Sequence, residues 1–259
     1  MTLDKKSAIE KMRKETGARM IDCQKALHSA NGNIEEAKEW LRKKGIASGA
    51  KKADRVAADG GVAVYAKDNR GIMLEINSET DFVAKSSDFI QFIHTVLDLA
   101  WSKKATSVEA LHNIPHNEMS IEEMRLALAG KTGENIVIKR LVEQSVQPGV
   151  VSSYVHNALS PSIGKIGVLV TLQSDADPKE LDMLGKKIAM HVAASSPKYV
   201  RIQDVCPDEI NKEKEILGAQ IDEQKKGVSD EIRNKMLDGR MRKFFEENTL
   251  EEQTFALDS

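Results

Sequence analysis

The sequence predicts an α+β fold, and three patterns carry this prediction. Three short amphipathic helical patterns fill residues 1–45, a strand pair followed by a helix occurs twice between residues 61 and 194, and two charged helical patterns fill residues 208–245. A strand pair followed by a helix is typical of an antiparallel sheet with helices on one face. With 259 residues, 41% of them hydrophobic, the chain can bury a substantial core and is expected to form more than one domain.

Residues 1–45 predict three short helices around a thin core. Gly17 is the expected end of the first helix. Asn33 is the expected N-cap of the third helix, because Glu36 lies three residues further on, and Gly45 is its expected end. The apolar stripes of the three helices are formed by Ile9 and Met12, by Met20, Cys23 and Leu27, and by Ile34, Ala37 and Leu41.

The segment from Gly45 to Gly61 is rich in alanine, glycine and lysine, which predicts a partly helical linker and a domain boundary. A three-helix module of this size is too small for a deep active site. It is therefore expected to present a helix surface to a partner or to serve only as a folding cap on the next domain.

The most specific chemistry lies in the turn Thr80-Asp81-Phe82-Val83. Apolar residues alternate through the preceding run 71–77, which predicts a half-buried strand. Ser86 or Ser87 is expected to cap a helix that begins at Asp88. An acidic and an aromatic residue in a strand-to-helix turn can be a local cap and a core plug, or a carboxylate and a wedge presented to a partner. The broad apolar face of the helix contains Phe89, Phe92, Ile93, Val96, Leu97 and Ala100.

Residues 61–100 and 149–194 repeat one pattern of strand pair, turn and helix. The offset between matching residues grows from 88 at the glycines (149 − 61) to 94 at the helix ends (194 − 100), which indicates a diverged duplication and predicts two subdomains. The second unit has Ser174-Asp175-Ala176-Asp177-Pro178 at its turn, so the aromatic residue occurs once. The matching segments are 61–65 with 149–154, 71–77 with 166–172, and 88–100 with 181–194.

Two incomplete motifs argue against nucleotide and metal chemistry. Gly130-Lys131-Thr132 is similar to the end of a phosphate-binding loop, but the first glycine of that motif would fall at Arg125. Gly130 is instead expected to end a helix over residues 120–129. His112 and His116 have a metal-like spacing, but a proline lies between them and breaks any helix, so both are expected in a solvated loop.

Composition excludes several further classes of function. The chain has 38 basic and 40 acidic residues, and a net charge of -2 gives no overall field for nucleic acid. Cys23 and Cys206 are far apart and lack the spacing of a disulfide framework or a zinc site. No apolar run approaches the roughly 20 residues of a membrane span, and residues 1–6 lead into an amphipathic helix rather than a signal sequence, so a cytoplasmic protein is expected. His191, inside the predicted helix 181–194, is expected to be a core or groove residue rather than a base.

Residues 208–245 are dense in charged residues and helix formers. Lys226-Gly227 separates two runs with narrow apolar seams, which predicts an antiparallel helical hairpin projecting from the core. An ordinary helix pair packed on a sheet is the alternative. The seams contain Ile210, Ile216, Leu217 and Ile221, then Val228, Ile232, Met236, Leu237 and Met241.

Three parts of the sequence resemble the bacterial elongation factor Ts family. The run Gly17-Ala18-Arg19-Met20-Ile21-Asp22-Cys23-Gln24-Lys25-Ala26-Leu27, with Gly32 to Ala37 and Trp40 to Gly45, is similar to the N-terminal ubiquitin-associated-like (UBA-like) domain of that family. The family carries Thr-Asp-Phe-Val where this chain has Thr80 to Val83. The run Asp238-Gly239-Arg240-Met241-Arg242-Lys243-Phe244 resembles the pattern that leaves the family's protruding coiled-coil hairpin. The resemblance covers nearly the whole chain.

The resemblance implies five segments. They are a UBA-like three-helix domain with its linker at 1–54, a core N-subdomain at 55–140, the first part of a core C-subdomain at 141–206, a coiled-coil hairpin at 207–245 and a return to the C-subdomain at 246–259. Family members usually continue past the point that matches Thr254 to Ser259. The C-subdomain is therefore expected to be cut short, either by truncation or with an exposed sheet edge.

The resemblance also implies a function. It implies a guanine nucleotide exchange factor that binds GDP-bound and nucleotide-free elongation factor Tu during translation elongation. Such a protein is not an enzyme of bond chemistry, and the resemblance implies no cofactor, no metal ligands, no direct nucleotide binding, no nucleic acid and no membrane contact.

The implied contact with elongation factor Tu centres on the turn after the first strand pair. We hypothesise that Phe82 inserts between helices of the partner's nucleotide domain as a wedge, and that Asp81 disturbs the surroundings of the partner's magnesium ion. Thr80 and Val83 are expected to hold the shape of the turn. Further partner contacts are predicted at Met20, Ile21 and His156.

Three alternatives stay open at this point. A UBA-like binding module on an unrelated scaffold would explain residues 1–45 but neither the turn nor the duplication. An enzyme with a pocket between the two core halves conflicts with the incomplete motifs. RNA binding through Lys51-Lys52 and Lys103-Lys104 would show a steep salt dependence.

Overall fold

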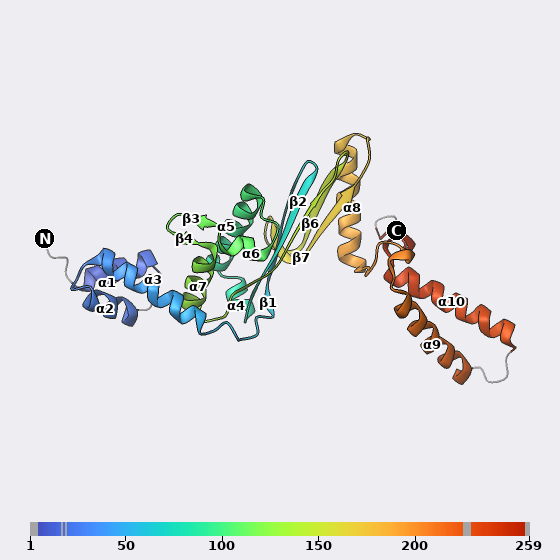
Figure 1. The fold of residues 1–259 in the computed structure, drawn as a ribbon, viewed down its shortest axis with the longest axis horizontal. Coiled ribbons are helices and arrows are strands. Elements are labelled where there is room, and N and C mark those ends of the chain that lie inside the picture. The colour runs from blue at the N-terminus through green and yellow to red at the C-terminus, as the bar shows by residue number, and fades with distance from the viewer. Residues whose placement is uncertain (1–4, 17, 19, 225–228, 257–259) are drawn as a thin grey trace. The chain divides into compact units, whose positions relative to one another are not determined.

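The computed structural model describes residues 5–16, 18, 20–224 and 229–256, and it confirms the α+β class (Figure 1). The chain forms two compact units, Met1–Asp182 and Met183–Ser259, and the boundary falls inside one helix. The expected helix end at Gly17 and the expected hairpin tip at Lys226-Gly227 lie outside the described residues.

The first unit begins with three helices, α1 (Lys5–Thr16), α2 (Met20–Ser29) and α3 (Ile34–Ala50). Asn33 is the N-cap of α3, as predicted, because its Oδ1 accepts hydrogen bonds from the backbone N–H groups of Glu35 (3.0 Å) and Glu36 (3.4 Å). The Glu36 carboxylate in turn accepts a 2.8 Å hydrogen bond from Asn33 Nδ2. The small core of the three helices consists of Ala8, Met12, Cys23, Ala26, Leu27, Ala30 and Ala37.

The third helix does not end at Gly45, and Gly130 does not end α7 (Ile121–Thr132); both predictions are wrong. The two helices pack closely through their glycines, since a Cβ on Gly49 would lie 2.1 Å from the carbonyl oxygen of Leu126. The stop of α7 is Gly133, which has the left-handed φ of 87° that favours glycine. The glycines inside these helices therefore serve a close helix contact and not a helix end.

One five-stranded antiparallel sheet, in the order β5-β2-β1-β7-β6, contains both predicted strand pairs. The first pair is β1 (Asp59–Lys67) with β2 (Arg70–Ser78), and the second is β6 (Val150–Ser160) with β7 (Ile163–Leu172). The fifth strand, β5 (Val137–Ser145), pairs with β2.

In backbone conformation Gly149 matches Gly60, and not Gly61 as the sequence comparison predicted. Gly60 and Gly149, each at the start of a strand pair, have φ values of 132° and 143°. A Cβ on Gly60 would lie 2.2 Å from the carbonyl oxygen of Ile76, and one on Gly149 would lie 2.0 Å from that of Leu172. Both positions therefore require glycine for the same reason, close approach to the neighbouring strand.

The main core of this unit lies between the sheet and α5 (Ser87–Lys103). Ser86 caps this helix, because its hydroxyl oxygen accepts a hydrogen bond from the N–H of Phe89 at 3.4 Å. The predicted apolar face is buried in full, in one core with Ile72, Leu74 and Ile76 of β2. The remaining elements are α4 (Asp81–Ala84), α6 (Val108–His112), and the short strands β3 (Pro115–His116) and β4 (Met119–Ser120).

The second unit contains most of α8 (Pro178–Ser195), then α9 (Pro207–Gln224) and α10 (Asp230–Asn248), with short 3-10 turns at Ile202–Asp204 and Leu250–Glu252. The helices α9 and α10 pack side by side (Figure 1), and the guanidinium of Arg233 donates two hydrogen bonds to Asp222, at 2.6 and 2.8 Å. His191 is 2% exposed, and its Nε2 lies 3.0 Å from Oε1 of Gln253. The prediction that it is a core or groove residue is confirmed.

Candidate functional site

The turn Thr80–Val83 forms the start of the one-turn helix α4, immediately after β2. Thr80 is the N-cap, with extended backbone (φ -129°, ψ 159°), and its hydroxyl oxygen accepts a 3.5 Å hydrogen bond from the N–H of Val83. Val83 packs against the main core, and the next residue, Ala84, is fully buried. The turn is thus anchored on its inner side.

Phe82 points away from this anchor. Its exposed fraction is 84%, so it is not a plug for its own core. Burying a phenylalanine side chain is worth about 1.5–3 kcal/mol, and the folded chain does not gain this stabilisation at position 82. An exposed large apolar side chain on a short, anchored turn is suited to burial against another molecule.

Asp81 is the first residue of α4 and is not its cap. Its carboxylate accepts a 2.7 Å hydrogen bond from Lys85, one turn further along the chain. This hydrogen bond raises the pKa of Lys85 above its ordinary value. The pair is exposed, and exposed ion pairs contribute little to stability because water screens them, so a partner can displace Lys85 from Asp81 at low cost.

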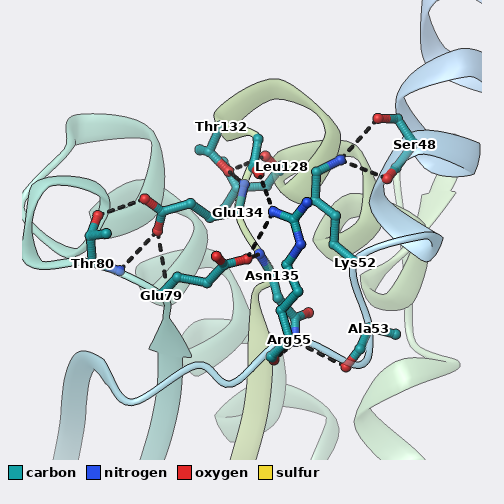
Figure 2. A network of polar contacts seen from close by, with 11 residues as sticks. Ser48, Lys52, Ala53, Arg55, Glu79, Thr80, Leu128, Thr132, Glu134 and Asn135 are labelled. Carbon is teal, nitrogen blue, oxygen red and sulfur yellow. Dashed lines mark hydrogen bonds and ion pairs between the residues drawn. The ribbon is translucent and has the colours of Figure 1, made fainter.

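A second acidic residue, Glu134, lies outside the turn in sequence but binds it through hydrogen bonds. This contact was not predicted from the sequence. Its carboxylate accepts hydrogen bonds from the backbone N–H groups of Glu79 (3.1 Å) and Thr80 (3.0 Å) and from the hydroxyl of Thr80 (2.6 Å), as Figure 2 shows. Glu134 lies in the connection between α7 and β5, 54 residues beyond Thr80. No local sequence signal links two such positions.

Asn135 extends this network to the linker after α3 (Figure 2). Its backbone N–H donates to the carboxylate of Glu79 at 2.6 Å, and its Nδ2 donates to the carbonyl oxygens of Ala53 (3.1 Å) and Arg55 (2.7 Å). Arg55 also lies 3.5 Å from the Glu79 carboxylate. Asn135 is only 1% exposed, so these bonds are shielded from water.

Met20 and Ile21 lie at the start of α2, with exposed fractions of 54% and 64%. The predicted apolar stripe of Met20, Cys23 and Leu27 is therefore only partly a core stripe, since Cys23 and Leu27 are buried and Met20 is not. Met20 is the first residue of the helix, beyond the edge of the small core.

His156 is exposed on β6, and its Nδ1 lies 3.3 Å from the hydroxyl of Tyr154. The two residues are separated by one position on the strand and so share a face of the sheet. The structure therefore gathers Thr80 to Val83 into one site and leaves His156 and the start of α2 on other elements.

A cleft of about 670 Å³ lies among α2, α3, α5 and α7. Two of its lysines are paired, Lys44 with Asp22 at 2.5 Å and Lys131 with Asp88 at 2.8 Å. Histidine and cysteine are absent from the described residues that line it. Ser48 and Lys52 also line the cleft, and Lys52 Nζ donates a 3.0 Å hydrogen bond to the Ser48 hydroxyl oxygen.

The described ranges contain no group of three histidine, cysteine, aspartate or glutamate side chains arranged to hold a metal ion. His112 differs from its prediction as a solvated residue, because it is half-buried, with Nε2 3.8 Å from the carboxylate of Glu122. Across the same described ranges, every helix is too short or too polar to span a bilayer.

Comparison with known proteins assigns the family. The family model "Elongation factor TS" matches residues 79–259, and the model "Elongation factor Ts, mitochondrial, N-terminal" matches residues 1–51. The chain is 44% identical to elongation factor Ts of Rhodospirillum centenum over 252 residues, which is 96% of this chain and 81% of that protein. It is also 44% identical to the factor of Rhodospirillum rubrum and 42% identical to that of Maricaulis maris, over 96% of this chain in both cases and 81% and 80% of those proteins. The chain therefore belongs to the elongation factor Ts family, whose members act in translation elongation during protein biosynthesis.

Proposed function

We propose that this chain is a guanine nucleotide exchange factor that binds elongation factor Tu and accelerates the release of GDP from it. The observation that carries the proposal is Phe82, exposed to 84% on a turn that is anchored by Thr80 and Val83, in a chain of the elongation factor Ts family. In this role the chain changes the affinity of its partner for a nucleotide and makes or breaks no covalent bond.

Thermodynamic linkage defines what the turn has to achieve. If the chain binds nucleotide-free elongation factor Tu more tightly than the GDP form, GDP must bind the complex more weakly by the same factor. A nucleotide held at nanomolar affinity represents about 12 kcal/mol of binding free energy. Rapid release therefore requires a ternary complex in which the contacts of the partner with the nucleotide are strained.

The proposed wedge supplies this strain. Phe82 inserts between helices of the partner's nucleotide-binding domain, which buries the ring that is exposed in the free chain. Asp81 exchanges Lys85 for groups near the partner's magnesium ion. Magnesium requires near-octahedral oxygen ligands, so a small displacement of a helix or loop weakens its hold on the phosphates.

Other surfaces are assigned supporting contacts in the same proposal. Met20 and Ile21 offer exposed apolar surface on α2, and His156 offers an exposed imidazole on β6. The three helices α1 to α3 are proposed to be a UBA-like domain, and α9 with α10 a coiled-coil hairpin. The limits of the five segments at residues 54, 140, 206 and 245 belong to the same proposal.

The proposal is tested by following the release of a fluorescent GDP analogue from elongation factor Tu in excess unlabelled GDP, with the chain at catalytic concentration. The wild-type chain is expected to accelerate release, and an Asp81→Ala, Phe82→Ala double variant is expected to lose the acceleration. Val56→Ala is the matched control, because Val56 is also apolar and 83% exposed but lies in the linker. Binding without any acceleration by the wild-type chain would contradict the proposal and favour a binding module.

A further inference from the structure

We propose that Glu134 is a positioning residue for nucleotide exchange, which fixes the geometry of the turn that carries Phe82 and, with Asn135, couples that turn to the three N-terminal helices. This inference rests on the proposed exchange function and deepens it. Among the described residues, the Glu134 carboxylate accepts hydrogen bonds from Glu79 and Thr80, at the start of the turn (Figure 2).

The turn needs an external support because α4 is a single turn of four residues. Helix initiation is costly, and isolated helices shorter than about 12 residues are marginal in water. The internal cap bond, from the N–H of Val83 to the Thr80 hydroxyl, is 3.5 Å long and so at the limit of a hydrogen bond. The bonds to Glu134 are 2.6 to 3.1 Å long and involve a charged acceptor, which makes them the stronger restraint.

All hydrogen bonds that the described residues make to the Glu134 carboxylate come from Glu79 and Thr80. One bond orients the side chain of the cap, and the other two fix the backbone immediately before α4. The arrangement is reciprocal, because the Glu79 carboxylate accepts from the backbone N–H of Asn135 at 2.6 Å. Residues 79–80 and 134–135, far apart in sequence, thus each donate backbone N–H groups to a carboxylate of the other segment.

Glu134 is itself held by the end of α7. The left-handed Gly133 terminates that helix, and the N–H of Glu134 donates to the hydroxyl of Thr132 at 3.3 Å. The Thr132 hydroxyl donates to the carbonyl oxygen of Leu128 at 3.0 Å. The helix α7 packs against α3 through backbone contacts at glycines. The backbone of Glu134, which follows α7, is therefore held in a fixed position relative to the turn.

Asn135 adds the connection to the N-terminal helices. Its side-chain N–H groups hold the carbonyl oxygens of Ala53 and Arg55, in the linker that leaves α3. A force on Phe82 is therefore transmitted through these hydrogen bonds to the connection between α7 and β5 and to the linker. The turn therefore cannot move without breaking hydrogen bonds of this partly buried network.

The kinetic test compares Glu134→Ala with Glu134→Gln in the GDP-release assay. The alanine variant is expected to lower the maximal release rate about tenfold or more, with a change of less than about threefold in the half-saturating concentration, because binding surfaces elsewhere remain. The glutamine variant keeps an acceptor oxygen for the backbone N–H groups and an amide for the Thr80 hydroxyl, so it is expected to recover most of the rate. Glu143→Ala is the control. Glu143 is also a partly exposed carboxylate, but it lies near the end of β5, away from the turn, and pairs with Arg70 of β2.

A double-variant comparison separates positioning from general destabilisation. If Glu134 acts through Phe82, then Glu134→Ala is expected to cause no further loss of rate in a Phe82→Ala background. A loss of the same factor in both backgrounds would overturn the proposal. Retention of the full release rate by Glu134→Ala would also overturn it.

Amide hydrogen exchange of the chain alone reports on the turn without any partner. In Glu134→Ala, the amides of Glu79 and Thr80 are expected to exchange at least tenfold faster, while those of Phe92 to Ala100 in α5 keep their protection. Unchanged protection of Glu79 and Thr80 overturns the positioning role even if the release rate falls. A wild-type chain that does not accelerate GDP release overturns the proposed function and the role of Glu134 in it, and the amide result then still states whether Glu134 orders the turn.

Discussion

Gly130 on α7 lies so close to Gly45 on α3 that a Cβ at position 130 would stand 2.2 Å from the carbonyl oxygen of Gly45. The atom in the way belongs to the backbone of another helix and cannot rotate aside. This contact sets the distance between the N-terminal helices and the rest of the first unit.

Gly130→Ala is therefore expected to destabilise the chain by about 1–3 kcal/mol, the usual cost of overpacking, despite the higher helix propensity of alanine. Thermal unfolding measures this, since a domain of this size loses about 2–4 °C per kcal/mol. Gly45→Ala is the matched control, because its Cβ would be 3.9 Å from Ala127, an ordinary contact. Equal melting temperatures for the two variants would contradict this account of the helix crossing.

Phe82→Ala is expected to separate function from stability. The side chain is 84% exposed, so the free energy of unfolding should change by less than about 0.5 kcal/mol. Acceleration of GDP release should fall at least tenfold, because a central aromatic contact is commonly worth about 2 kcal/mol or more. The release rate with Phe82→Leu, which keeps most of the apolar volume, should lie between the rates with the wild-type chain and with Phe82→Ala. A stable Phe82→Ala chain with full exchange activity would remove the wedge from the mechanism.

The two cysteines are expected to differ in reactivity. Burial raises the pKa of the Cys23 thiol, which lies in the core of the three helices, whereas Cys206 is exposed. An aromatic disulfide reagent at pH 8 should therefore label one thiol per native chain and two after unfolding in urea. In Cys206→Ser the native chain should release almost no chromophore. Two native thiols that react at equal rates would show that the N-terminal core opens readily.

The ion pair of Asp59 on β1 with Lys165 on β7 predicts a small pH dependence of stability. The hydrogen bond from Lys165 lowers the pKa of Asp59 below its ordinary value of 3.8. The stabilisation is therefore complete above pH 3.8 and is lost as the pH falls through the lower folded value. Exposed pairs are worth about 0–1 kcal/mol, so the effect is modest.

Urea unfolding at pH 5 and at pH 3 measures it. The wild-type midpoint should fall further between these two pH values than the midpoint of Asp59→Asn, because all other carboxyl groups are common to both chains. Parallel shifts of the two midpoints would show that the pair contributes no net stability.

The elements that depend on neighbouring residues were predictable from the sequence. The strand β2, the Ser86 cap and the buried face of α5 follow from local periodicity and capping, and the structure reproduces them. The sequence left open whether Phe82 is a plug in its own core or is exposed to a partner. Its exposed side chain excludes the core plug.

The elements that depend on distant residues were not predictable. A glycine inside a helical pattern can end the helix or admit a neighbour, and only the packing of α3 on α7 shows that Gly45 and Gly130 do the latter. Glu134 was missed for the same reason, because its hydrogen-bond donors lie 54 and 55 residues away. The sequence analysis considered the acidic residue as the local cap, whereas the structure shows that Thr80 is the cap.

The five-stranded sheet is joined in its middle by few residues. Strand β1 pairs with β2 over nine positions, from Asp59 opposite Ser78 to Lys67 opposite Arg70, but with β7 at two, Val62 opposite Gly164 and Ala63 opposite Ile163. The first pairing closes loops of fewer than 20 residues, whereas the second joins residues about 100 positions apart, and loop-closure entropy grows with that separation. Each hairpin can therefore form its own ladder early, and the union of the two halves is expected to be the late and slow step of folding.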